Sequence, residues 1–420
     1  MKVPRRFWAG IASLVVLVAW LVGATMLLVP DLVTGDQPAA RSGPAEGTVQ
    51  ARPRPVTAPS VTSCGTGAEN DPAGRVARDR AHVVNVGFED LVSDDPDRIA
   101  FLASRLDAVG ATGVRIAIGR LDWIAFPWAG HEDIESSDVV ETGRDYAAEA
   151  IAAFRCDKNG YRRDIYVGID TIFGRELERH PDLAGVNETG ERSTHFASLT
   201  SWKSGPFSDR LADLAHEVAV RYSADVVNVT ELMFDNDTFG LEDLADFTKA
   251  HGRTDWPRAA DGTVDRNDPG FQEWRSDAMV SILARVQKRL EGTGAALTLD
   301  VRSPVSSDPR GRPELGQHYP RLLEHVDRLV LWNFPGTDGT SGIFDTAQLS
   351  ELLIDESPDR YELEIGLWNW KQGGSISTAT LRRELDAALA HDIRFVSVTP
   401  TSLFTQDIWL VLRQTWTDST

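Results

Sequence analysis

The chain has 420 residues, and its 63 acidic side chains outnumber its 43 basic ones, so its formal net charge is −20. With 42% hydrophobic and 25% charged residues, its composition is that of a folded globular protein rather than of a disordered chain. The negative charge argues against a nucleic-acid partner, because binding phosphates needs clustered Lys and Arg.

The first thirty residues have the pattern of a membrane anchor. A basic tail, residues 1–6 (MKVPRR), precedes residues 7–30, which carry no charge. An apolar run of about 20 residues is long enough to cross a bilayer. Because the positive charges stand only on its N-terminal side, the tail is expected in the cytosol. The interpretation is a single-pass protein of the cell membrane with its folded domain outside; the alternative is a cleaved signal peptide, which leaves the compartment unchanged.

Residues 31–78 are rich in Pro, Ala, Gly, Ser and Thr and lack apolar periodicity, which is typical of a flexible linker. The chain has two cysteines: Cys64 lies in this linker, and Cys156 lies in the region that follows. In an oxidising compartment two cysteines favour one disulfide, Cys64–Cys156. Two unrelated thiols are the alternative.

Residues 79–418 alternate short β-branched runs with longer amphipathic segments, and eight such units are typical of a (β/α)8 (TIM) barrel. The strands are expected near residues 82–87, 113–118, 164–170, 225–230, 296–301, 328–333, 363–368 and 394–398. The helical patterns between them include residues 97–109, 144–155, 208–222, 272–290, 378–390 and 407–415.

The alternation within the strands places charged side chains inside the barrel. Arg115 on the second strand, Asp170 on the third and Asp300 on the fifth face inward, as do Arg302 and Glu364. Barrel interiors are ordinarily filled by Val, Ile and Leu. Since a buried charge is tolerated only when it is paired or used, this interior favours a functional site.

Barrel enzymes place their reacting groups at the C-terminal ends of the strands. Glu231 ends the fourth strand and Asp300 ends the fifth, so the two acids could act across one site. Glycoside hydrolysis needs such a pair: one carboxyl group donates a proton, and the other attacks the sugar or activates water. Glu231 is the candidate acid/base and Asp300 the candidate nucleophile or base. For each acid, a salt bridge or a helix cap is the alternative.

Other side chains near the strand ends are candidates for substrate binding. Tryptophan rings offer flat faces on which sugars stack, although some of these rings serve as core filling. The candidates are Trp123, Trp332, Trp368, Asn333, Asp170, Arg302, Asp235 and Arg115. The chain has no nucleophile-elbow, phosphate-loop or metalloprotease motif, so we expect neither a cofactor nor a metal, and an esterase or deacetylase is disfavoured.

Four segments resemble the barrel core of bacterial glycoside-hydrolase-like proteins: DVVNVTELMFD, ALTLDVRSP, VDRLVLWNFPG and LEIGLWNW. The resemblance implies a (β/α)8 fold and polysaccharide processing outside the cell, and it places the strand-four acid at Glu231. The expected function is a membrane-anchored glycoside hydrolase that cleaves a cell-surface or extracellular polysaccharide. Thr230 stands where such families often have Asp. The rival hypothesis is therefore a non-catalytic glycan-binding barrel that scaffolds assembly of cell-envelope polysaccharide.

Overall fold

A computed structural model describes residues 64, 80–93, 95–337 and 345–417. The expected basic tail and membrane anchor, together with all of the expected linker except Cys64, lie outside the described residues. Among the residues that are described, no helix is long and apolar enough to cross a membrane.

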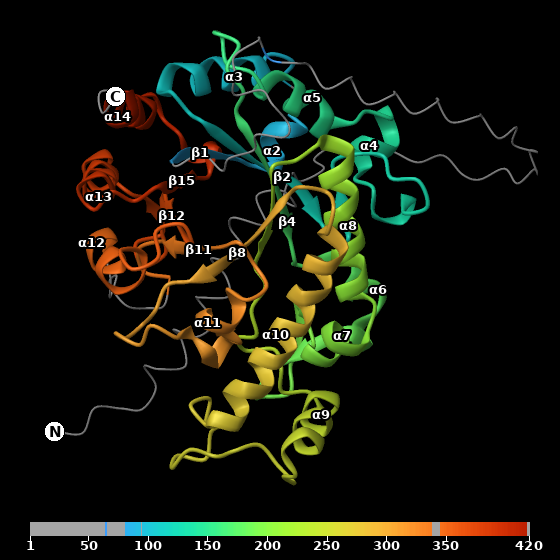
Figure 1. The fold of residues 1–420 in the computed structure, drawn as a ribbon. Coiled ribbons are helices and arrows are strands. Elements are labelled where there is room, and N and C mark those ends of the chain that lie inside the picture. The colour runs from blue at the N-terminus through green and yellow to red at the C-terminus, as the bar shows by residue number, and fades with distance from the viewer. Residues whose placement is uncertain (1–63, 65–79, 94, 338–344, 418–420) are drawn as a thin grey trace, which may run out of the picture.

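Eight parallel strands form a closed barrel (Figure 1). They are β1 (Ala81–Val86), β2 (Gly113–Arg120), β4 (Asp164–Asp170), β7 (Val226–Thr230), β8 (Ala296–Arg302), β11 (Arg328–Asn333), β12 (Tyr361–Gly366) and β15 (Phe395–Thr399). Each strand pairs with the next, and β1 pairs with both β2 and β15, which closes the ring. The predicted (β/α)8 barrel is confirmed. Two strands differ from prediction by two residues: β2 runs two residues further, and β12 lies two residues earlier; the ends of the other strands agree within one residue.

Helices surround the ring, some of them covering the strands from outside and others lying at the strand ends. The longer ones are α3 (Arg98–Val109), α5 (Tyr146–Phe154), α8 (Phe207–Tyr222), α9 (Leu241–His251), α10 (Pro269–Leu290), α13 (Thr378–Ala390) and α14 (Gln406–Thr417). The shorter ones are α2 (Phe88–Leu91), α4 (Ser137–Thr142), α6 (Gly174–Arg179), α7 (Leu199–Ser204), α11 (Tyr319–Leu322) and α12 (Thr346–Leu349).

The main core lies between the strands and these helices. Val114, Ile116 and Ile118 alternate along β2 and are fully buried on its outer face, as the sequence predicts. On α8, apolar residues recur every three or four positions, including Leu211 and Val218, so one stripe of the helix faces the strands. Burying one such side chain stabilises the fold by roughly 1.5–3 kcal/mol. Helices α8 and α10 lie side by side in Figure 1.

Inside the ring the chain is polar. The guanidinium of Arg115 on β2 bridges Glu362 and Glu364 on β12, and all three side chains are buried. The Asn85 amide on β1 donates to Glu364 at 2.6 Å. The Asn228 amide on β7 likewise donates to Asp300 on β8 at 2.8 Å. The predicted polar interior is confirmed. Because an unpaired buried charge is costly, this network explains how the barrel tolerates its acids.

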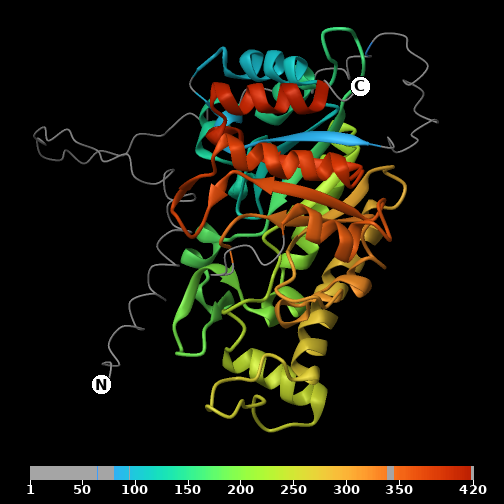
Figure 2. The same cartoon turned by 90° about the vertical axis from the view of Figure 1, so that its left-hand side faces the viewer.

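The connections at the C-terminal strand ends are long. The β5–β6 hairpin (Ala184–Val186 and Arg192–Ala197) follows α6, and residues 231–268, which include α9, follow β7. Residues 303–318 follow β8 and contain the β9–β10 hairpin (Gly311–Arg312 and Gln317–His318). The β13–β14 hairpin (Trp368–Asn369 and Gly374–Ser375) follows β12, and β3 (Trp123–Ile124) folds back on β2. The C-terminal strand ends face the bottom of Figures 1 and 2, where α9 lies.

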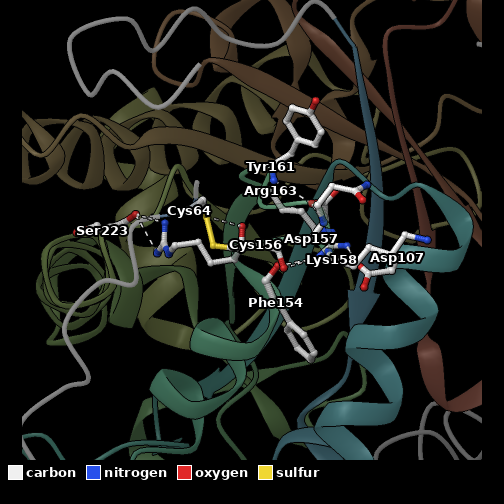
Figure 3. The surroundings of a disulfide bond; sticks show 11 residues. Cys64, Asp107, Phe154, Cys156, Asp157, Lys158, Tyr161, Arg163 and Ser223 are labelled. Atoms are coloured by element: carbon white, nitrogen blue, oxygen red, sulfur yellow. Dashed lines mark hydrogen bonds and ion pairs between the residues drawn. A yellow bond between two sulfur atoms is a disulfide. The ribbon is translucent and has the colours of Figure 1, made fainter. Parts of the chain in front are cut away.

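The opposite end of the barrel carries the disulfide. Cys64 and Cys156 are bonded, with their Cα atoms 5.5 Å apart, which confirms the predicted pairing (Figure 3). Cys156 lies between α5 and the N-terminal end of β4, and Arg163 beside it donates to the Phe154 carbonyl oxygen at 3.0 Å. The disulfide therefore ties residue 64 to the face of the barrel that lies away from the C-terminal strand ends.

Candidate active site

Three residues at neighbouring strand ends form one row across the barrel. In the strand register Arg120 on β2 lies opposite Asp170 on β4, and Asp170 lies opposite Thr230 on β7. The register of β2 shifts between Ala117 and Gly119, an irregularity of the β-bulge type that re-aims the residues after it. The row places Asp170 beside the residue that precedes Glu231.

Glu231 begins the turn that leaves β7. Its φ angle is +61°, in the left-handed region that residues with a Cβ rarely adopt. Its side chain is half-buried. Burial raises the pKa of Glu231 to about 7, and the negative charge of Asp170 contributes in the same direction, while Arg302 opposes the rise. A carboxyl group that keeps its proton near neutral pH is suited to act as a general acid.

Asp170 lies opposite Thr230, the residue before Glu231, in the strand register. It forms an ion pair with Arg120 at 3.1 Å and accepts the Ile172 N–H at 2.8 Å. Its side chain is 26% exposed. Burial raises the pKa of Asp170, but Arg120 opposes that rise. The adjacent Thr171 donates its N–H and hydroxyl to the Thr230 carbonyl oxygen at 3.2 and 3.0 Å, which fixes the two strand ends together.

Asp300 lies deeper in the barrel than the sequence suggested. Its side chain points inward from β8 and is bonded to Asn228, and the residue is only 5% exposed. Burial raises the pKa of Asp300, and the charge of Arg115 opposes this. Arg115 lies in the same interior network. Both side chains are more deeply buried than those of Glu231 and Asp170, and the charge of Asp300 adds to the rise in the pKa of Glu231.

Aromatic side chains flank the acids. Trp332, one residue before the end of β11, lies opposite Arg302 and Glu364 in the strand register, and the Arg302 guanidinium lies 5.9 Å from its ring centroid. Trp368 lies beyond the end of β12 because that strand begins earlier than expected. Both rings are half-buried. Their indole N–H groups find no hydrogen-bond partner in the described part of the chain.

A second aromatic group lies beside Arg120. Trp123 on β3 packs edge-on against Phe88 with the ring centroids 3.9 Å apart, and the Arg120 guanidinium is 5.4 Å from the Trp123 centroid. Both rings are half-buried. Flat rings at strand ends are the surfaces on which the apolar faces of sugars stack.

Two predicted substrate-binding residues lie elsewhere. Asn333 follows the inward-facing Trp332, so it faces outward, and its amide donates to Thr346 at 3.0 Å and Glu384 at 3.3 Å. Its assignment to the mouth of the barrel was wrong, because adjacent strand residues point to opposite faces. Asp235 lies in the loop after β7, where it pairs with Arg266 at 3.5 Å.

Sequence reasoning missed Arg120 and His195. Arg120 reaches the row because β2 extends past its predicted end. His195 lies on β6, whose backbone accepts the Phe173 N–H at 2.9 Å. Burial lowers the pKa of His195, as does the charge of Arg120, whereas Asp170 opposes this. No sequence motif marks the β5–β6 hairpin as part of the site.

Within the described ranges, no group of three or more His, Cys, Asp or Glu side chains is arranged to hold a metal ion.

Comparison with known proteins supports the fold. No protein-family model matches the chain. No curated protein matches it either. Among solved structures, the glycoside hydrolase domain of PgaB (BpsB) from Bordetella bronchiseptica is 16% identical, with a TM-score of 0.56 over 80% of this chain and 99% of that one. A β-galactosidase from a psychrophilic Marinomonas is 13% identical, with a TM-score of 0.58 over 80% of this chain and 59% of that one. The catalytic domain of β-amylase from Paenibacillus polymyxa is 9% identical, with a TM-score of 0.53 over 81% and 99%.

These identities are low, and the likeness is one of fold: the chain shares the (β/α)8 barrel with proteins whose names describe glycoside hydrolases.

Proposed function

We propose that this protein is a glycoside hydrolase. The observation that carries the proposal is Glu231, a carboxyl group with a pKa of about 7, set at the strand ends beside the ion-paired carboxylate of Asp170. Glycoside hydrolysis uses two carboxyl groups in different environments, so that one is protonated while the other is charged. The aromatic rings on either side of the pair are suited to bind sugar.

The two acids take different roles. Glu231 donates its proton to the glycosidic oxygen as the bond to the anomeric carbon breaks. Asp170 then attacks that carbon or takes a proton from the water that attacks it. We assign this second role to Asp170 instead of Asp300, because Asp300 is 5% exposed and bonded inside the barrel. Arg120 favours the charged form of Asp170 by pairing with it.

The substrate we propose is a cell-surface or extracellular polysaccharide. A chain of sugars can contact several rings: Trp332 lies near the end of β11, and Trp123 and Trp368 lie on the connections after β2 and β12. We also propose that residues 7–30 anchor the protein in the cell membrane, with the barrel outside. The disulfide supports this location, because disulfides persist in oxidising compartments.

The test is hydrolysis by the full chain. Bacterial polysaccharides are incubated with the protein, and new reducing ends are measured. Glu231→Gln should abolish turnover while folding and glycan binding remain, because the amide cannot donate the proton. Glu291→Gln, an exposed glutamate after α10 at the other end of the barrel, is the matched control and should retain full activity. Full hydrolysis by Glu231→Gln would reject the assignment.

A parallel comparison assigns the second acid. Asp170→Asn should reduce turnover by several orders of magnitude, whereas Asp300→Asn, which keeps the shape of the buried group, should reduce it far less. The opposite ranking would return the role to Asp300.

The second candidate is a glycan-binding barrel without hydrolytic activity. The observation that favours it is Thr230, which takes the place of an acid and interacts with Asp300 through its side chain. Binding of polysaccharide with no reducing ends formed by the wild-type chain would favour this function.

A further inference from the structure

The backbone of Glu231 needs support from its surroundings. Among the described residues, the others with a Cβ and a positive φ are Ser223, which caps α8, and Asp392, in the turn after α13. Those two lie at helix ends, where a left-handed residue is common. Glu231 lies at a strand end, and such a conformation persists only where neighbouring contacts determine it.

Gln317 provides two of these contacts. Its side-chain Nε2 donates to the carbonyl oxygen of Leu232 at 3.1 Å, one residue after Glu231. Its Oε1 accepts the backbone N–H of Arg302 at 3.0 Å. The Gln317 side chain is fully buried. One amide therefore joins the turn that carries the acid to the end of β8, which carries the arginine that opposes its rise in pKa.

The connection that presents Gln317 is itself fixed. Gln317 pairs with Arg312 in the β9–β10 hairpin. The Phe234 N–H donates to the Leu315 carbonyl oxygen at 3.0 Å, and the Tyr319 hydroxyl donates to the Arg302 carbonyl oxygen. The hairpin and the residue after it thus contact the chain just beyond Glu231 and bind both the backbone N–H and the carbonyl oxygen of Arg302. The Gln317 amide spans these two segments and bonds the backbone of each, and the Arg302 side chain adds a contact from its Nε to the Met233 Sδ at 3.2 Å.

We infer that Gln317 is a positioning residue for Glu231, which keeps the acid in its left-handed turn and at a fixed place relative to Arg302. The inference rests on the proposed function for its catalytic consequence only. An amide suits the task because it has a donor for one strand end and an acceptor for the other. Neither an apolar side chain nor a carboxylate offers both.

The experiment measures the acid directly. The full chain is labelled with ¹³Cδ-glutamate, the Glu231 signal is assigned by its loss in Glu231→Gln, and its pKa is read by titration. In Gln317→Met the turn relaxes and Glu231 gains water, so its pKa should fall by one unit or more. Turnover of a polysaccharide cleaved by the wild type should fall at least tenfold in kcat with little change in KM. The limb of the pH profile due to Glu231 should move with the pKa.

A matched variant separates positioning from general destabilisation. Asn333→Leu removes a half-buried amide that bonds Thr346 and Glu384 outside the barrel. It should lower the thermal unfolding temperature without moving the Glu231 pKa. If Gln317→Met does not fold, Gln317→Asn replaces it, because its neutral amide is one methylene shorter and cannot reach both Leu232 and Arg302 at once.

Each outcome decides the inference. A lowered Glu231 pKa supports it even if no polysaccharide is cleaved, in which case the proposed hydrolase function fails by itself. A folded Gln317 variant with an unchanged or raised Glu231 pKa overturns it. So does an equal shift in Asn333→Leu.

Discussion

Replacing Glu364 by Gln should remove part of the pH dependence of this protein's free energy of unfolding. Glu364 and Glu362 meet the single guanidinium of Arg115, and Asp300 lies in the same interior layer. Burial raises the pKa of Glu364 to about 8, with the charge of Asp300 adding to the rise and Arg115 opposing it. Glu364 therefore keeps a proton in the folded state that it loses in the unfolded chain once the pH exceeds about 4.5.

The sign follows from the proton balance. Between these two pKa values the folded state binds one more proton than the unfolded state, so the free energy of unfolding falls as the pH rises. The slope is about 1.4 kcal/mol per pH unit, and the interval of roughly 3.5 units gives an upper limit of about 5 kcal/mol. Gln resembles the protonated acid and does not titrate. The stability of Glu364→Gln relative to wild type should therefore increase by up to this amount from pH 4.5 to pH 8.

The assay is urea unfolding, followed by tryptophan fluorescence, at pH 5, 6, 7 and 8 for both proteins. Other groups titrate in the same range, including Glu231, Asp237 and Asp243, whose pKa values burial also raises. They are common to both proteins and cancel in the difference. Glu291→Gln serves as the exposed control and should follow the wild type in parallel. A Glu364→Gln curve parallel to the wild type would refute the buried-proton reasoning.

Two further predictions concern the site. Arg302→Met should move the alkaline limb of the hydrolysis profile to higher pH, because the Arg302 charge opposes the raised pKa of Glu231; an unmoved limb in the pH profile would contradict this. Glu231→Gly should be more stable than Glu231→Ala by about 1 kcal/mol in urea unfolding, because only glycine adopts φ +61° without strain. Equal stabilities would mean that the turn is unstrained.

The sequence by itself determined the architecture. Alternation with a period of two identified eight strands, and apolar periodicity identified the helices between them. Both patterns can be seen in the sequence because each element buries one face, so its apolar residues recur at regular spacing. The two cysteines were enough to predict the disulfide. The acids at the ends of β4, β7 and β8 were also found from the sequence.

Tertiary structure decided which of these acids meet at the surface. The packing of side chains decides how exposed each acid is: Asp170, opposite the residue that precedes Glu231, is 26% exposed, whereas Asp300 is only 5% exposed inside the barrel. An irregularity in β2 brought Arg120 opposite Asp170. Gln317, in the hairpin that follows β8, joined the end of β8 to the turn after β7. These contacts link residues far apart in the chain, so the spacing of residues along the sequence does not predict them.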